Sequence, residues 1–273
     1  GIPRPANLLF LYLLGFYLLL LSLKVDYRLS AVGAIGFAFS SYFFIIIMAG
    51  HMTKAHAIAY VPMVVAAVLY TYRGRMLLGG VLTALAVALE LYANHLQITY
   101  YLVLVLILIG VVQFVKDLKA NNLTSFAKRS GVLVLAALLA SGTAVTRLST
   151  TMEYGTESTR GKSELTTDLD NKTSGLDKDY ATSWSYGIAE TFTLLIPNFY
   201  GGASQGSLTT DSETYQAIKR APNAKQLIKQ LPLYWGAQPF TSGPTYAGAI
   251  VMFLFIFGLL FVKSEIRVWI LLA

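Results

Sequence analysis

The sequence contains no cysteine, few charged residues and none of the familiar nucleotide-binding signatures. Without cysteine, neither a disulfide nor a thiolate ligand or nucleophile can form. Only 13% of the residues are charged, and the chain has no glycine-rich phosphate loop, Rossmann fingerprint or Ser/His/Asp pattern. These absences exclude disulfide scaffolds and cysteine chemistry, and they leave soluble nucleotide-dependent enzymes and serine hydrolases without a sequence signal.

Histidine is scarce as well, and its spacing does not favour a metal site. The chain has three histidines, His51, His56 and His95. His51 and His56 are five residues apart, a separation that does not share one helix face, and no HxxxH or HExxH pattern occurs. A divalent ion held by these histidines and nearby carboxylates therefore stays only as an alternative.

Apolar residues dominate what is present. They make up 55% of the chain and give it a strongly positive mean hydropathy, which is a membrane composition. A helix needs about 17 to 25 apolar residues to cross the hydrocarbon layer, whereas β-barrel strands are about ten residues long and alternate. We therefore predict an all-α, polytopic transmembrane helix bundle. Its seven complete spans are predicted at residues 7–23, 29–49, 55–71, 76–93, 96–115, 130–146 and 246–262.

The organisation along the chain follows from these spans. Residues 1–146 form a bundle of six spans, 147–245 form a large extracytoplasmic insert, and 246–273 hold the seventh span and the start of an eighth. Since Gly1 is neither a methionine nor part of a signal peptide, the sequence is interpreted as a fragment of a longer protein.

Basic residues in the connections predict the orientation. Alternate connections are rich in lysine and arginine, which is typical of the cytoplasmic side, whereas the short second and fourth connections hold only Lys54. The net charge of +7 therefore reports membrane topology and not nucleic-acid binding. The start of the chain and the insert are predicted to lie outside. The basic residues on the inner side are Lys24, Arg28, Arg73, Arg75, Lys116, Lys119, Lys128, Arg129, Lys263 and Arg267.

Most of the remaining titratable groups of the bundle map to the outer face. The string GHMTKAH is predicted to form a tight turn there, and ANHLQ a second one. Glu90 lies about one helical turn below ANHLQ and should point inward, because an ionisable group in the membrane is costly unless it faces protein or a partner. Helix N-termini at this face would favour a phosphate. The candidate substrate- or phosphate-binding residues are His51, Lys54, His56, Glu90, His95 and, from the insert, Arg160.

The insert supplies carboxylates that suit acid–base chemistry. The string EYGTESTRGKSEL places Glu153 and Glu157 near Arg160, and Glu190 follows in an aromatic, apolar segment at 184–199. This segment and the basic, apolar segment 217–235 are predicted to lie in the headgroup layer or to pack against the bundle. TSGP at 241–244 is interpreted as the start signal of the seventh span. Solvated loops explain the same charged residues.

Several separate strings, in this order, resemble the bacterial YfhO family of polytopic membrane proteins, and the similarity covers nearly the whole chain. They are SYFFIIIMAGHMTKAHAIAYVPM, TYRG, ANHLQITYY, EYGTESTRGKSELT, SWSYGIAETFTLLIPNFYGG and YWGAQPFTSGPTYAGAI.

The resemblance implies a membrane glycosyltransferase of the GT-C type in the bacterial cytoplasmic membrane. Such an enzyme transfers a sugar from a polyprenyl-phosphate donor to a cell-envelope glycan or polymer outside the membrane. The expected ligand is then the lipid-linked sugar donor, and no cofactor is assigned. The family's catalytic carboxylate commonly lies in a first external loop, which would precede Gly1, so Glu153, Glu157 and Glu190 are expected to support the reaction. A transporter or flippase for a lipid-linked glycan and a membrane scaffold are the alternatives, although spans that are apolar in their middles are less typical of transporters.

Overall fold

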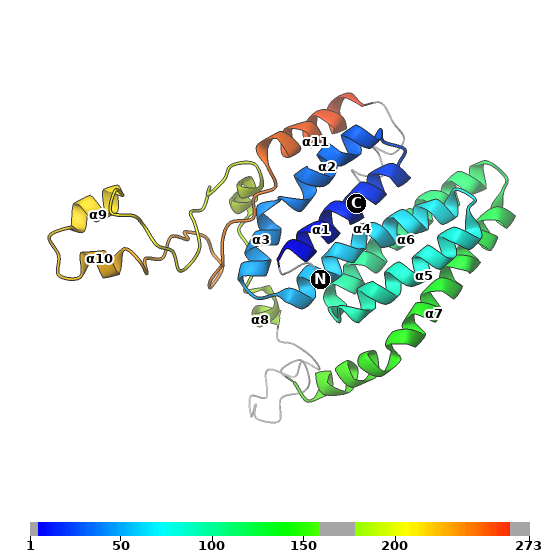
Figure 1. The fold of residues 1–273 in the computed structure, drawn as a ribbon, viewed down its shortest axis with the longest axis horizontal. Helices are drawn as coiled ribbons and strands as arrows, with labels where there is room; N and C mark the ends of the chain where they lie inside the picture. The colour runs from blue at the N-terminus through cyan, green and yellow to red at the C-terminus, as the bar shows by residue number, and fades with distance from the viewer. Residues whose placement is uncertain (1–4, 159–177, 263–273) are drawn as a thin grey trace. The chain divides into compact units, whose positions relative to one another are not determined.

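The computed structural model describes residues 5–158 and 178–262, and helices are the regular elements in them (Figure 1). The chain divides into two compact units. Of the described residues, the helical unit comprises 5–39, 50–154 and 257–262, and the insert unit comprises 40–49, 155–158 and 178–256.

The helical unit is built from six helices. Their bounds are α1 (Ala6–Ser22), α2 (Tyr27–Ala38), α4 (Met52–Tyr72), α5 (Met76–Tyr92), α6 (Leu96–Lys119) and α7 (Leu123–Thr156), the last two residues of which belong to the insert unit. Short turns join α1 to α2, α4 to α5, α5 to α6 and α6 to α7, so the two helices of each of these pairs run antiparallel, and α3 (Ser41–Met48) lies between α2 and α4 in the sequence.

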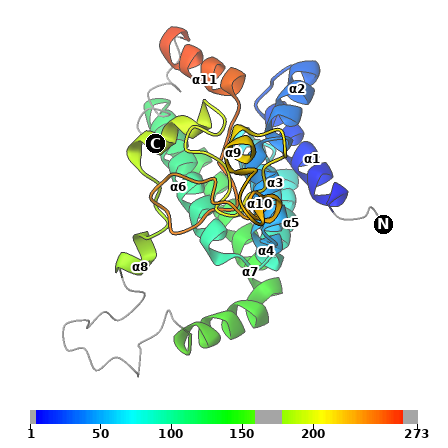
Figure 2. The same cartoon turned by 90° about the vertical axis from the view of Figure 1, so that its left-hand side faces the viewer.

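The insert unit contains shorter elements joined by irregular chain. They are α3 (Ser41–Met48), α8 (Lys178–Thr182), the 3₁₀ helix η1 (Ile188–Leu194), α9 (Glu213–Ile218) and α10 (Ala224–Leu227), and α11 (Ala249–Phe261) begins here. Isolated β-bridges pair Gly201 with Tyr234 and Gly206 with Leu231. These bridges join the two ends of the chain segment that carries α9 and α10, and both helices are labelled in Figure 2.

The apolar helices have the dimensions of membrane spans. Within 5–158 and 178–262, α4, α6 and α7 are each long and apolar enough to cross a membrane, and α2 with α3 would make a fourth if this broken pair is one span. Helices α1, α5 and α11 are apolar but shorter. The predicted all-α fold is therefore confirmed for the described residues, and three to four of its helices could cross a membrane, while seven spans and the external placement of the insert stay predictions.

Two predicted boundaries are wrong. GHMTKAH is not a free turn, because α4 already begins at Met52 and takes His56 into its first turns. Gly50 makes the change of direction with a φ of +78°, so the chain turns at this glycine and not over the whole GHMTKAH string as predicted. TSGP does not start a helix either, because α11 begins only at Ala249.

Two further helix bounds also differ from the predicted spans. The predicted second span is broken between α2 and α3, around Phe39 and Ser40. Helix α7 continues to Thr156, beyond the predicted end at Thr146. Polar residues after Thr146 extend this helix because its ladder of backbone hydrogen bonds does not require an apolar face.

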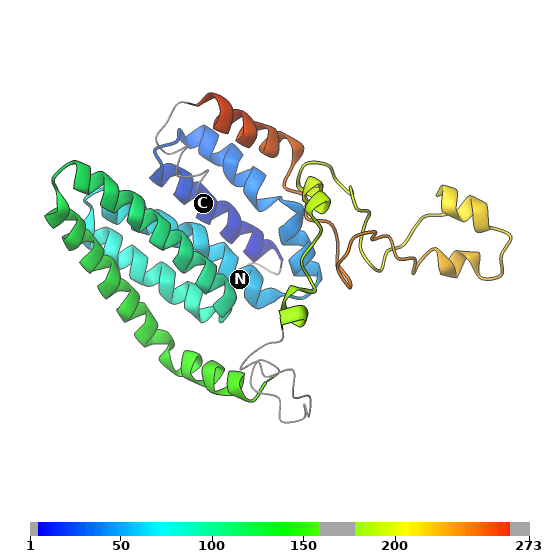
Figure 3. The same ribbon diagram turned by 180° about the vertical axis from the view of Figure 1, so that it is seen from behind.

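Helix α4 is the centre of the helical unit. It packs against α1, α5 and α6 (Figures 1 and 3), and its alanines at positions 55, 57 and 59 are fully buried. Ala55 and Ala59 are four residues apart and share one face of the helix, and their small side chains let α1 approach closely, as small residues do in membrane bundles. Tyr12 donates a buried hydrogen bond of 2.9 Å to the carbonyl of Ala55, and a Cβ on Gly15 would lie 3.0 Å from the carbonyl oxygen of Ala59. These paired positions show that α1 and α4 run parallel.

A polar cluster ties the α6–α7 connection to the end of α4. Asp117 is 6% exposed, accepts a 2.8 Å hydrogen bond from Gln113 and pairs with Arg129 at 3.6 Å. The same guanidinium donates to the carbonyl of Tyr72 at 2.7 Å. This carbonyl belongs to the last turn of α4, where helical partners are missing. Arg129 therefore satisfies a helix end and a buried carboxylate together.

Asp117→Ala is expected to lower the free energy of unfolding by about 1 to 3 kcal/mol, because it leaves the partly buried Arg129 without its counter-charge. Lys119→Ala removes an exposed charge from the same helix and should change the stability by less than about 0.5 kcal/mol. Denaturant unfolding in detergent measures both. Equal stability of the two variants would mean that the Asp117–Arg129 pair contributes nothing to the fold.

Candidate functional site

The predicted outer-face residues lie at one end of the helical unit. Short turns join α4 to α5 and α5 to α6, so the start of α4, the end of α5 and the start of α6 share that end. His51 precedes α4 as its N-cap residue, and Lys54 and His56 lie in its first turns. His56 Nδ1 is 2.8 Å from the carbonyl oxygen of Met52. His95 caps α6 and accepts from the N–H of Ile98 at 3.4 Å.

Glu90 lies at the same end but is enclosed by protein. Its side chain is fully buried, which confirms that it points inward. The Thr99 hydroxyl donates to its two carboxylate oxygens at 2.9 Å and 3.1 Å. This contact joins the last turn of α5 to the first turn of α6. Glu90 lines neither the pocket of the insert unit nor the groove between α1, α4 and α5, so its direct contact with a substrate remains a prediction.

Three further predicted site residues, Glu153, Glu157 and Arg160, follow in the sequence near the end of α7. Glu153 lies on the exposed surface of α7, and Glu157 is exposed just after that helix ends. Arg160 lies outside the described residues. Among residues 5–158 and 178–262, no three His, Asp or Glu side chains gather closely enough to hold a metal ion.

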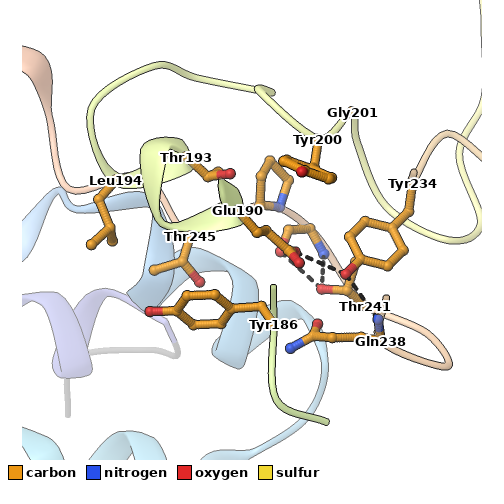
Figure 4. A pocket seen from close by; sticks show the side chains of 12 residues that line it. Tyr186, Glu190, Thr193, Leu194, Tyr200, Gly201, Tyr234, Gln238, Thr241 and Thr245 are labelled. Carbon is orange, nitrogen blue, oxygen red and sulfur yellow. Dashed lines mark hydrogen bonds between the residues drawn. The ribbon is translucent and has the colours of Figure 1, made fainter. Parts of the chain in front are cut away.

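Glu190 is the predicted residue that lies in a pocket, and this pocket belongs entirely to the insert unit (Figure 4). The first wall comes from η1 and the residues around it, which contribute Tyr186, Thr193 and Tyr200. The second wall comes from the segment that begins at the Gly201–Tyr234 β-bridge and contributes Tyr234, Gln238 and Thr241. Two strings far apart in the sequence, SWSYGIAETFTLLIPNFYGG and YWGAQPFTSGPTYAGAI, therefore form one site.

The backbone brings these walls together through a short ladder of hydrogen bonds. The N–H of Trp235 donates to the carbonyl of Tyr200 at 2.9 Å, and the N–H of Gly202 donates to that of Leu233 at 2.8 Å. Pairing of main-chain groups fixes the register of the two segments. As a result, Tyr234 is placed opposite η1.

The Glu190 carboxylate is held by two donors. Tyr234 Oη donates to Glu190 Oε1 at 2.8 Å, and the N–H of Gly187 donates to Oε2 at 3.2 Å. The second contact is the reach of an N3 glutamate back to the start of its own helix. Tyr234 is in turn fixed by the N–H of Gln238 at 3.1 Å. Each carboxylate oxygen has two lone pairs, so both retain capacity to accept a ligand hydroxyl.

Tyr234 keeps its proton at neutral pH. Burial raises the pKa of the Tyr234 phenol, the N–H of Gln238 opposes this, and the neighbouring Glu190 carboxylate raises it further. The phenol therefore stays a donor to Glu190 at neutral pH. This arrangement orients the carboxylate but does not neutralise it.

The pocket has one unused buried hydroxyl. Thr193 Oγ1 is buried and has no hydrogen-bond partner among the residues that the structure describes. A buried polar atom without a partner costs about 1 to 3 kcal/mol, so a ligand that reached it would recover this energy. The pocket volume of about 50 Å³ is small, and it can take one polar edge of a ligand rather than a whole oligosaccharide.

Sequence reasoning placed Glu190 among the candidates but missed its partners. Tyr234, Gln238 and Thr193 are ordinary residue types with no motif spacing, and Tyr234 lies 44 positions from Glu190. The signal present was that both strings combine aromatic residues with Gly and Pro, which is also typical of any loop. Comparisons with protein-family models, with curated proteins and with solved structures find no match for this chain.

Proposed function

We propose that this protein is a membrane glycosyltransferase of the GT-C type, similar to the YfhO family, which transfers a sugar from a polyprenyl-phosphate donor to a cell-envelope acceptor. The observation that carries the proposal is the Glu190 pocket. It combines an oriented carboxylate, two further tyrosines and an unpartnered buried hydroxyl at one opening. Aromatic faces, hydroxyl groups and a carboxylate are together suited to a sugar edge, which has both apolar C–H and hydroxyl groups.

In the proposed reaction, an acceptor hydroxyl oxygen attacks the anomeric carbon of the donor sugar. The bond from that carbon to the lipid phosphate oxygen breaks, and the lipid monophosphate leaves with the electron pair. The hydroxyl proton passes to a carboxylate base. We assign Glu190 a supporting role, in which its oxygens accept hydroxyl hydrogens of the bound sugar, because Tyr234 and Gly187 fix its orientation.

The proposal places the protein in the bacterial cytoplasmic membrane with seven complete spans and the insert outside. The parallel packing of α1 and α4 supports this topology, because the first and third spans must cross in the same direction. Exposed apolar side chains on and after η1, Ile188, Phe192, Ile196 and Phe199, support contact of the insert with the headgroup layer. Phosphate contacts by His51, Lys54, His56, Glu90, His95 and Arg160 belong to the same proposal.

The test is sugar transfer by the full-length protein in liposomes, supplied with polyprenyl-phosphate hexose or N-acetylhexosamine and with envelope polymer as acceptor. Glu190→Gln is expected to reduce transfer by about tenfold to a hundredfold, since a hydrogen bond to a charged group contributes about 1.5 to 3 kcal/mol. Glu213→Gln, at an exposed acid of α9 in the same unit, is the matched control and should keep full transfer.

Three other results would overturn the proposal or its assignment of Glu190. Movement of the lipid-linked sugar between leaflets without transfer would establish the transport alternative. If the protein neither transfers nor moves any of the donors, the membrane-scaffold alternative would remain. Equal transfer by the Glu190 and Glu213 variants would remove Glu190 from the reaction.

A further inference from the structure

A second and much larger cavity lies within the helical unit. It is a groove of about 880 Å³, within the range of roughly 300 to 1,000 Å³ that is usual for ligand pockets. Helix α4 contributes Met63, Ala66 and Ala67, and the end of α1 and one side of α5 contribute the rest. None of the residues proposed for sugar transfer lines it.

Side-chain size explains why the groove is open. Ala66 and Ala67 on α4 and Ala86 on α5 are small and lie at its base. Four leucines of α5 line it at helical spacing and are partly exposed, at 37% to 57%: Leu78, Leu82, Leu85 and Leu89. Residues at this spacing share one helix face. The groove therefore has a continuous apolar wall along most of α5.

One end of the groove is strongly basic. Lys24 follows α1, and Arg73 and Arg75 flank the turn between α4 and α5. All three residues are exposed, and within the described part of the chain none of them forms an ion pair. Ser22 and Tyr70 add a hydroxyl each near the same end. The groove thus presents three positive charges at one end and leucine and alanine side chains over the rest of its length.

We propose that this groove binds a membrane phospholipid with an anionic headgroup, with its phosphate at Lys24, Arg73 and Arg75 and an acyl chain along the α5 leucines. The charge pattern selects this occupant. An apolar helix would fill the groove but would not neutralise the three basic side chains. A free phosphate would neutralise them but would leave the long apolar wall of the groove without a contact. An anionic phospholipid matches both parts. Basic residues next to apolar helices attract anionic lipid in this way.

The site lies at the opposite end of α4 from His51, Lys54 and His56, because α4 runs from Met52 to Tyr72. It is therefore distinct from the place proposed for the sugar donor. In the predicted topology, the basic end lies in the cytoplasmic leaflet. The bound lipid would fill the space between α1 and α5 and hold the two helices on α4.

The experiment is native mass spectrometry of the full chain in detergent, with phosphatidylglycerol and phosphatidylcholine of identical acyl chains. We expect phosphatidylglycerol to be retained at least about tenfold better. Each basic residue near a membrane surface contributes about fivefold in affinity for anionic lipid. The triple variant Lys24→Gln, Arg73→Gln, Arg75→Gln should therefore lose most of this preference. The control variant Lys116→Gln, Lys119→Gln, Lys128→Gln removes three basic residues that do not line the groove and should keep it.

A second pair of variants tests whether the lipid lies in the groove. Leu85, 57% exposed, lines it, whereas Val81, 58% exposed, is on the same helix outside it. Leu85→Trp should reduce phosphatidylglycerol retention severalfold, and Val81→Trp should not. Equal retention of the two lipids would exclude the headgroup assignment. Equal effects of the two tryptophans, or of the two charge variants, would show ordinary annular lipid and overturn the site. None of these readouts depends on sugar transfer.

Discussion

The Gly79→Ala variant is expected to be the most destabilised single-methyl substitution in the helical unit. A Cβ at Gly79 would lie 2.3 Å from Thr71 Oγ1 and 2.8 Å from both the Cα and the N of Thr71. Two of these atoms are backbone, so no side-chain rotation relieves the contact. Thr71 is itself fully buried and donates to the carbonyl of Ala67 at 3.0 Å. Helices α4 and α5 would have to separate at this contact.

The expected size follows from the cost of overpacking. Forcing an extra methyl into a packed site costs about 1 to 3 kcal/mol or more, whereas exchanging glycine for alanine in a helix returns about 0.5 to 1 kcal/mol. We expect a net loss of about 1 to 2 kcal/mol in the free energy of unfolding. In a protein of ordinary marginal stability, this is a large fraction of the total. Thermal or denaturant unfolding in detergent measures it.

Gly142→Ala is the matched control for this prediction. Gly142 lies inside α7, and nothing within 4 Å would meet its Cβ. This variant should be unchanged or more stable, by up to about 1 kcal/mol, because only helix propensity differs. The two alanine substitutions are thus predicted to have opposite signs. If Gly79→Ala is as stable as Gly142→Ala, the close contact between α4 and α5 is not present in the protein.

The second large effect is expected at Gly236 in the insert unit. A Cβ there would lie 2.1 Å from the Tyr234 hydroxyl oxygen and 2.7 Å from Glu190 Oε2. The residue therefore stands directly beside the hydrogen bond that orients the carboxylate. Gly236→Ala must displace Tyr234, Glu190 or both. We expect sugar transfer to fall by up to about a hundredfold, because a misplacement of about 1 Å can have that effect.

The global fold should survive this change, since the affected atoms belong to a small, partly exposed pocket. Gly187→Ala provides the control. Gly187 adjoins η1 and donates its N–H to Glu190, its φ is −65°, and a Cβ there would meet nothing within 4 Å. Transfer by Gly187→Ala should stay within about twofold of the parent, because its N–H is retained. Comparable transfer by the two variants would mean that the Tyr234–Glu190 contact does not matter for the reaction.

The sequence by itself determined that the chain is helical and that several of its helices are long and apolar enough to cross a membrane. Continuous apolar runs can only satisfy their backbone groups inside a membrane as helices, and helices α4, α5 and α6 accordingly lie close to the predicted ranges. It also determined that Glu90 must be shielded, since a carboxylate among apolar residues needs a protein partner. Thr99 proves to be that partner.

Tertiary structure alone decided which residues meet. The pairing of Glu190 with Tyr234 depends on backbone hydrogen bonds between two segments that are more than thirty positions apart. The register in which two such segments pair does not produce a periodic pattern in the sequence. The groove beside α5 depends on the parallel packing of α1 on α4, which brings Lys24 to the same end as Arg73 and Arg75. Hydropathy is a property of one segment of the sequence. A cavity, in contrast, forms where the side chains of several neighbouring helices do not fill the space between them.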